Sequence, residues 1–487
     1  MSSLLSRLGS AEVGLSALLH SLGELVAFAS VSADPEAAHH VLGAAHWLRR
    51  ALEDIGAETR LVCPRRARGG GAETSGHPIV LGRIVVDPSK PTIVFYGHYD
   101  VVGASGDGWL TPPFQLTVSD GCARGRGVTD NKAPIVAMIA MVSEVLRSGE
   151  PPPFNFAFVL DGEEEIGSVG FEKAISNECG WLAGEAGVAC VLISNTYWLS
   201  DERPCLVYGL RGVVHLDVSV RGGSRSLHSG VHGGAVYEPT AELVAVLGTL
   251  VDQPTGTVRA PGFEKSVRPL GAEEEQLYDG VAFDADAYAK RTRASVRHVG
   301  KEDAARKLMM ARWRQPCLSI NQLSANANSN NLSVIPPTAS AHISVRFVPD
   351  QTGAEMVEVV AAHLHAEFQK LRTPNALTVI CCGGGEWWIG EPDSKPYQAA
   401  AHALESVWGQ APSFIREGGT IPVTSALERL MGAPAVHLSL GQASDNAHLD
   451  NERMSLQALY KGKQTLRQFI IFFAAALADE PEAARSR

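Results

Sequence analysis

The sequence predicts an α/β protein: a larger domain on a mostly parallel sheet, with a smaller α+β domain inserted into it. Three observations lead to this fold class. Apolar strands alternate with helical segments over residues 1–209, several strands end in polar residues, and at residue 210 the pattern changes to strands with period-two alternation. We therefore assign residues 1–209 and 385–487 to the larger domain and residues 210–384 to the insertion.

Size and composition restrict the class of protein. At 487 residues the chain exceeds one typical domain, and its 45% hydrophobic and 20% charged residues are those of a soluble globular protein. A net charge of -11 argues against nucleic acid or an anionic membrane as partner. We expect no signal peptide, and the longest apolar run, residues 469–477, is too short to span a bilayer. Eight cysteines without a CxxC pair predict a cytoplasmic protein.

The elements of the larger domain follow in order. Helical periodicity covers residues 11–28 and 36–55, with a capping turn at 32–35 between them. Strands are expected at 58–62, 79–86, 91–96, 154–160 and 188–193, a polar loop at 64–77 and a helix at 134–146.

The insertion has its own pattern. Alternating strands at 213–221 and 339–348 flank a helix at 238–251 and a polar helical region at 273–313. The chain returns to the larger domain near 386–389, and helices at 396–407 and 454–477 flank a last loop at 436–448.

Three consecutive glutamates, residues 163–165, follow the buried strand at 154–160. Adjacent carboxylates repel one another and raise each other's pKa, so an isolated triplet would be a solvated turn. Other ligand-type side chains, however, occur at the ends of neighbouring strands and helices. Carboxylates and imidazoles that converge on one edge of a sheet build a metal site.

Five further residues join this candidate site. His98 and Asp100 are two apart, so on an extended segment they share a face, and an aspartate beside a histidine ligand usually orients its ring. Asp130 directly precedes an apolar helix, where a helix N-cap is the favoured interpretation of that position alone. Asn195 follows the strand at 188–193, and His448 ends the last loop.

Together these motifs resemble the two-zinc exopeptidases, the family of carnosinase, cytosolic non-specific dipeptidase, aminoacylase and carboxypeptidase G. The similarity is greatest to the carnosinase and cytosolic non-specific dipeptidase branch and covers nearly the whole chain. The motifs that carry it are His98-x-Asp100, Gly127-x-x-Asp130-Asn131-Lys132, Glu164-Glu165, Leu227-His228-Ser229-Gly230, Arg416-Glu417-Gly418-Gly419 and Asp445-x-x-His448.

The resemblance implies a division of roles at the metal site. Asp130 would bridge two metals, Glu165 and His448 would complete one site, and His98 with Asn195 the other. Glu164 would be the general base on the attacking water and Asp100 would orient His98, which leaves Glu163 as a solvated or structural neighbour. The implied cofactor is Zn²⁺, one or two ions per chain, with Mn²⁺ or Co²⁺ as alternatives. The family usually has a cis peptide after the bridging aspartate, which makes Asp130–Asn131 the candidate here.

The resemblance also implies a fold and a homodimer. It suggests a phosphorylase/hydrolase-like exopeptidase domain, with the insertion as a lid and dimerisation domain. His228 would reach the partner subunit's active site and stabilise the oxyanion. Arg346 would bind the substrate's terminal carboxylate. Four residues would contact the substrate backbone: Ser333, Gly418, Gly419 and Thr420.

Two positions depart from the family pattern. Relatives carry an aspartate ligand where this chain has Asn195, which brings no charge. We therefore expect weaker binding at the His98 site, and three alternatives stay open: a single zinc, a harder ion such as Mn²⁺, or loss of the second ion on purification. Relatives also have a substrate-contacting histidine near position 383, which is Gly383 here, so a wider pocket is expected.

The function that this resemblance implies is metal-dependent hydrolysis of a dipeptide or an N-acyl amino acid. One alternative is a diverged enzyme that uses the site for acyl transfer or biosynthetic deacylation. Another, from a different class, is an inactive homologue that acts as a binding protein, for which Asn195 is the supporting feature and Glu164 the opposing one.

Overall fold

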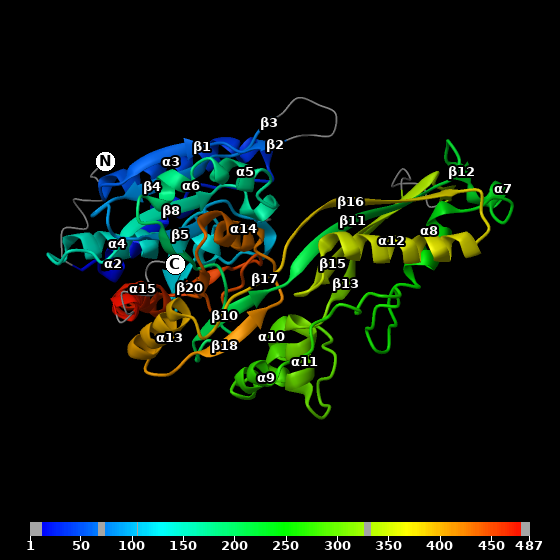
Figure 1. Cartoon of the computed structure of the whole chain (residues 1–487). Helices are drawn as coiled ribbons and strands as arrows, with labels where there is room; N and C mark the ends of the chain where they lie inside the picture. Colours follow the sequence, from blue (N-terminus) through cyan, green and yellow to red (C-terminus); the bar gives the residue numbers. More distant parts are fainter. Residues whose placement is uncertain (1–11, 67–73, 105, 326–332, 479–487) are drawn as a thin grey trace.

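The structure is a computed structural model in which residues 12–66, 74–104, 106–325 and 333–478 are described. It contains two main sheets, which lie in separate parts of the elongated molecule (Figure 1). The part of the 64–77 loop at 67–73, and the first residue of the helix expected at 11–28, lie outside the described residues.

The larger sheet has nine strands in the order β1-β4-β8-β5-β9-β19-β10-β17, with β18 paired to β10. Its strands are β1 (Glu58–Val62), β4 (Ile79–Ile84), β5 (Thr92–His98), β8 (Asn155–Asp161), β9 (Val188–Ile193), β10 (Cys205–Leu210), β17 (Trp388–Ile389), β18 (Ser413–Glu417) and β19 (Ala435–Leu438). Parallel pairing is confined to β8-β5-β9-β19 and to β10-β18. The α/β class is confirmed, and the sheet is mixed, with its parallel strands at the centre.

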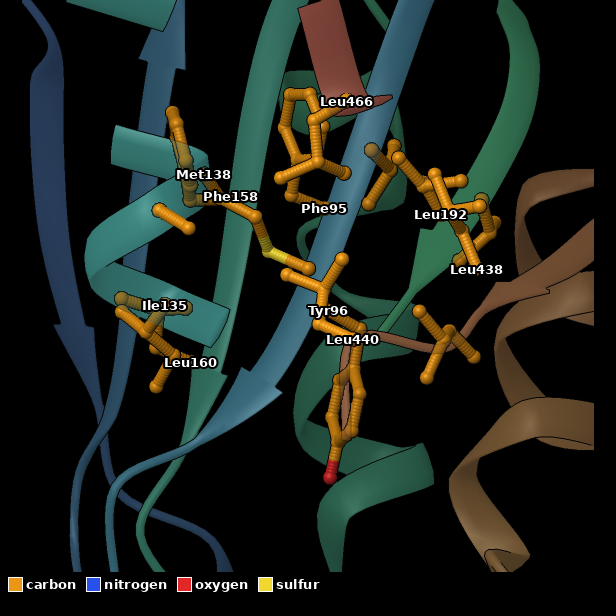
Figure 2. Close-up of a cluster of buried hydrophobic side chains, with 14 of the residues drawn as sticks. Phe95, Tyr96, Ile135, Met138, Phe158, Leu160, Leu192, Leu438, Leu440 and Leu466 are labelled. Atoms are coloured by element: carbon orange, nitrogen blue, oxygen red, sulfur yellow. The ribbon is translucent and has the colours of Figure 1, made fainter. Parts of the chain in front are cut away.

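Apolar strands and helices pack into one core around this sheet. β5 and β8 are buried along their whole lengths, and the rings of Phe95 and Phe158 lie 5.2 Å apart between them. Figure 2 shows these rings beside Met138 of α4 (Ala133–Arg147), a helix whose residues are buried from Ala133 to Val145. The helices of this domain include α2 (Leu15–Val26), α3 (Ala38–Asp54), α5 (Phe171–Ser176), α6 (Cys179–Ala183), α13 (Lys395–Trp408), α14 (Pro422–Met431) and α15 (Leu456–Ala478).

The second sheet is antiparallel, in the order β13-β15-β11-β16. Its strands are β13 (Cys317–Ala325), β15 (Thr338–Phe347), β11 (Gly212–Arg221) and β16 (Ala376–Gly385). One face packs on α8 (Pro239–Leu247) and α12 (Gly353–Lys370), where Leu216 and Ile343 belong to a separate apolar core. Burial alternates along β15, because one face of the sheet is covered and the other is open.

The polar helical region at 273–313 forms three helices: α9 (Ala272–Asp279), α10 (Ala285–Thr292) and α11 (Ala304–Trp313). Tyr278, Met309 and Trp313 are buried in the core of the larger domain and not in that of the second sheet. α9 and α11 are therefore held against the nine-stranded sheet, where both contact β18, and α10 packs on α11.

Most expected elements are present within a few residues of their predicted limits. The strands at 58–62 and 188–193 agree at both ends, and β5 runs on to include His98. The expected helix at 36–55 is split into a 3₁₀ turn (Pro35–Ala37) and α3. All eight cysteines are free, and none of the helices in the described ranges is long and apolar enough to cross a membrane.

Candidate metal centre and active site

The parallel centre of the larger sheet gathers the candidate residues at one edge. β8, β5, β9 and β19 are neighbours that run in the same direction, so their carboxyl ends lie together. His98 ends β5, Glu164 and Glu165 follow β8, Asn195 follows β9, and the loop after β19 leads to His448. Strand order therefore explains why residues so far apart in sequence meet.

Two imidazoles contact the carboxylate of Asp130, and the Glu165 carboxylate lies beside them. His98 Nε2 lies 2.9 Å from Asp130 Oδ1, and His448 Nε2 lies 3.1 Å from Asp130 Oδ2. The same His448 nitrogen is 3.0 Å from Glu165 Oε2. Ligand atoms of His98, Asp130 and Glu165 all lie within 4.8 Å of one another. This is the arrangement expected of a metal-bridging carboxylate flanked by two imidazoles.

Asp130 is not a helix N-cap. That interpretation of the sequence is wrong, because α4 begins at Ala133 with Lys132 at its N-cap position. Asp130 instead lies in a tight turn, Val128–Lys132, that follows Gly127 with its left-handed φ of 82°. The peptide bond between Asp130 and Asn131 is cis, as expected. Asn131 Nδ2 donates to Ser194 O at 2.6 Å, which ties this turn to the end of β9.

The charges of the cluster perturb one another. The pKa of Glu164 is raised to about 8, chiefly by burial and also by the nearby carboxylates of Glu165 and Asp130. Burial also raises the pKa of Glu165. Hydrogen bonds to Asp130 and Glu165 raise the pKa of His448 to about 10. Burial alone would lower the pKa of His98, but its hydrogen bonds to Asp100 and Asp130 raise it well above the usual value. The site therefore concentrates negative charge that a cation would stabilise.

Asp100 does more than the orientation of His98 expected of it. The His98 ring nitrogen Nδ1 lies 3.1 Å from the backbone oxygen of Asp100 and 3.4 Å from its Oδ1. The carboxylate itself accepts the backbone N–H groups of Glu164 and Glu165, both at 3.1 Å, and the Ser32 hydroxyl at 2.6 Å. Asp100 thus links the histidine to the turn that carries both functional glutamates.

Glu163 is structural, so the solvated alternative is wrong. It is buried and accepts the backbone N–H of His77 at 2.6 Å. The three glutamates of the triplet therefore occupy three different environments.

Sequence reasoning missed Glu452, which holds the Asp130 turn. Its fully buried carboxylate accepts the N–H groups of Gly127 at 2.8 Å, Thr129 at 2.9 Å and Asp130 at 3.1 Å. Arg126 completes the set with an ion pair at 2.8 Å. Its position four residues after His448 was the only available signal, since the partners are 322–326 residues away in sequence.

The donor set fits a bound metal ion. Asn195 Oδ1 is buried and has no hydrogen-bond partner among the described residues, and the same is true of Tyr197 Oη. A buried polar atom without a partner is unfavourable unless a ligand satisfies it. Asn195 lines the same cavity as Asp130, Glu164 and His448, so its carbonyl oxygen is available to a cation there.

This cavity has a volume of about 460 Å³ and is lined by apolar as well as charged side chains. Its lining includes Leu210, Trp198 and Ile421, and also Gly419 and Thr420 from the loop at residues 418–420, which we call the glycine loop. Its size suits a dipeptide or a similar small molecule.

Arg346 and the glycine loop lie at the boundary of the two sheets. Arg346 donates a hydrogen bond to Thr420 Oγ1, which donates to Arg211 O at 2.6 Å. Arg211 Nε donates to Gly418 O at 3.0 Å, and Arg211 N donates to Gly419 O at 3.1 Å. The structure therefore joins Arg346, Gly418, Gly419 and Thr420 in one network beside the cavity.

His228 and Ser333 are not brought to the metal centre of their own chain. β12 (Leu227–His228) pairs with β14 (Val334–Ile335) at the far end of the second sheet (Figure 1). His228 is exposed and its Nδ1 accepts the N–H of Gly230 at 3.1 Å, while Ser333 O accepts the N–H of Ser229 at 2.8 Å. The two residues are neighbours at this tip, apart from the other site residues.

Gly383 is paired with His215 across β16 and β11. A side chain at this glycine would meet nothing within 4 Å, and its φ of 138° disfavours other residues. Gly383 lines a cavity other than the one that contains Asp130 and Glu164, so the wider substrate pocket stays a prediction. His215 stacks on His342 with ring centroids 5.4 Å apart.

Comparison with known proteins identifies similar sequences over most of the chain. The sequence pattern of peptidase family M20/M25/M40 matches residues 94–471. The "Cys-Gly metallodipeptidase dug1" of Schizosaccharomyces pombe is 36% identical over 444 residues, which cover 91% of this chain and 92% of that protein. The human "Beta-Ala-His dipeptidase" is 35% identical over 399 residues, which cover 82% and 78% of the two chains.

Solved structures agree with these sequence matches. The di-peptidase Dug1p of Saccharomyces cerevisiae superimposes with a TM-score of 0.87 at 31% identity and 98% coverage of both chains. Human carnosine dipeptidase 1 gives a TM-score of 0.85 at 31% identity, covering 98% of this chain and 99% of the other.

Proposed function

The chain belongs to peptidase family M20/M25/M40, and we propose that it is a metal-dependent dipeptidase with Glu164 as its general base. The observation that supports this most directly is the convergence of His98, Asp130, Glu165 and His448, in which Asp130 and His448 line the same cavity as Glu164. Relatives named as dipeptidases do not favour acyl transfer or an inactive binding protein. The family resemblance seen in the motifs is thereby confirmed.

Five residues would hold the metal. Asp130 would bridge, with Glu165 and His448 on one side and His98 and Asn195 on the other. When bound, such ions lower the pKa of a water and polarise a carbonyl group. Zinc is the proposed ion, and Asn195 supports weaker retention at the His98 side because it adds no negative charge.

Glu164 would carry the proton. Its carboxyl group lines the cavity and is anchored through its own N–H to Asp100. The pKa of about 8 applies to the metal-free protein, and the positive charge of a bound metal ion would lower it and favour the ionised carboxylate. The carboxylate would then accept the proton of the attacking water and deliver it to the leaving amine.

The remaining contacts would come from two subunits. Arg346, fixed by Thr420, would bind the terminal carboxylate of the substrate through its planar guanidinium group. His228 would act on the partner subunit's site, which is consistent with its position at the exposed tip. We propose a cytoplasmic homodimer, in keeping with the free cysteines.

Substitution of the base tests the function. Glu164→Gln and the surface control Glu150→Gln should be assayed on neutral dipeptides and N-acyl amino acids with Zn²⁺, Mn²⁺ or Co²⁺. We expect a loss of at least about a hundredfold in kcat for Glu164→Gln, with metal binding retained, and wild-type rates for the control. Hydrolysis that survives in Glu164→Gln would refute the assigned base.

Subunit complementation tests the dimer. His228→Ala and Glu164→Gln should each be inactive alone. In an equal mixture about half of the dimers are mixed and each has one intact site, so about a quarter of wild-type activity should return. A mixture that stays inactive after verified subunit exchange contradicts a shared site.

A further inference from the structure

Two arginines form part of the wall of the cavity. Arg291 of α10 and Arg312 of α11 both line the cavity that contains Asp130, Glu164 and His448. This is unexpected in a chain whose net charge is -11, and none of the roles proposed above uses these two arginines.

Tyr288 fixes the position of this wall. The guanidinium carbon of Arg312 lies 4.9 Å from the centroid of the Tyr288 ring, and Phe283 packs on the same ring at 5.6 Å. Arg291 is three residues further along α10, on the same side of the helix as Tyr288, and its guanidinium carbon lies 5.8 Å from that ring. The Asp284 side chain caps α10 by accepting the N–H groups of residues 286 and 287, both at 2.9 Å.

The two arginines differ in their charge balance. Arg312 lies 3.7 Å from Glu417, which lines the same cavity, and both side chains are about three-quarters buried. Arg291 is exposed, and no ion pair between it and another described residue is present. Within the described part of the chain, Arg291 therefore leaves a positive charge at the cavity mouth without a matching carboxylate.

We propose that Arg291 selects substrates with a carboxylate in the side chain of the N-terminal residue, such as dipeptides that begin with Glu or Asp. This inference rests on the proposed dipeptidase function. The terminal carboxylate of the substrate is assigned to Arg346, in the network of Thr420, so Arg291 is available to the other half of the molecule. Arg312 is neutralised by Glu417 and contributes mainly by holding Tyr288.

Matched substrates and variants test this selection. Glu-Ala and Gln-Ala have nearly the same shape and differ in one charge. We expect wild-type kcat/KM to favour Glu-Ala by about fivefold or more, and Arg291→Gln to reduce that ratio to about one. Lys290 is the neighbouring positive charge on the same helix, but it does not line the cavity. Lys290→Gln should therefore leave the ratio of kcat/KM for Glu-Ala to that for Gln-Ala unchanged. Arg291→Glu should reverse the preference toward Lys-Ala.

Binding separates this inference from the proposed function. Calorimetry of Glu-Ala and Gln-Ala with Zn²⁺-loaded Glu164→Gln protein measures selectivity without turnover, and the same preference for Glu-Ala is expected. Equal affinities, or an Arg291→Gln effect that is the same for both dipeptides, would overturn the selection by Arg291. If Gln-Ala and Glu-Ala are hydrolysed equally well, only the inference about Arg291 fails. If no dipeptide is hydrolysed but Glu-Ala is bound preferentially, only the proposed function fails.

Discussion

Replacement of Glu452 should show how far a residue that is not itself a proposed metal ligand supports the stability and the metal affinity of the site. The carboxylate is fully buried, accepts three backbone N–H groups and pairs with Arg126 at 2.8 Å. Glu452→Ala leaves those donors and the buried guanidinium group without a partner. Breaking one buried ion pair costs about 3–5 kcal/mol, and loss of support for a ligand typically lowers metal affinity about 10–100-fold. Glu452→Gln should cost less, because its amide oxygen can still accept two of the N–H groups.

Urea unfolding with and without chelator measures the free energy of unfolding of each variant. Competition with a chromophoric chelator measures the affinity of each variant for Zn²⁺. We expect the order wild type, Glu452→Gln, Glu452→Ala in both assays. Glu405→Ala, an exposed glutamate of α13, serves as the control. The reasoning is refuted if Glu452→Ala unfolds at the wild-type urea concentration, or if it is destabilised yet binds Zn²⁺ with unchanged affinity.

Three further predictions follow from the site. Asn195→Asp should increase the metal retained per chain after gel filtration, as counted by elemental analysis; two tightly held zinc ions in the wild type would contradict the weak-site argument. In metal-free protein, burial raises the pKa of Glu164 to about 8 and that of Asp161 to about 7, so the folded state binds more protons than the unfolded state above pH 4. The free energy of unfolding should therefore fall as pH rises from 5 to 8. Saturating Zn²⁺ should make this fall smaller, as measured by urea titrations at each pH. Arg346→Lys should raise KM for dipeptides about tenfold or more with a smaller change in kcat, because an ammonium group cannot replace the fork; an unchanged KM would exclude Arg346 from carboxylate binding.

The sequence predicted three of the four central parallel strands and their terminal residues because local signals determine them. β5, β8 and β9 are short apolar runs, and each is followed within two or three residues by a polar side chain of the site. Parallel neighbours place such ends at one edge, so convergence follows from the pattern. The central strand β19 was missed because its residues were assigned to the loop at 436–448, and β10, β17 and β18 were missed as well. The pairings of these strands depend on contacts distant in sequence.

Asp130 shows why local rules fail at a functional site. Its sequence context, just before an apolar helix, favours an N-cap, and the cap would satisfy backbone donors locally. In the structure the N–H group of Lys132 donates to Gly127 O at 2.9 Å, and Glu452, from the other end of the chain, accepts the N–H groups of Thr129 and Asp130. The Asp130 carboxylate is thereby released for His98 and His448. The turn around Asp130 is held by a glutamate 322 residues away, so the Asp130 side chain need not cap the helix, and no local sequence rule contains that contact.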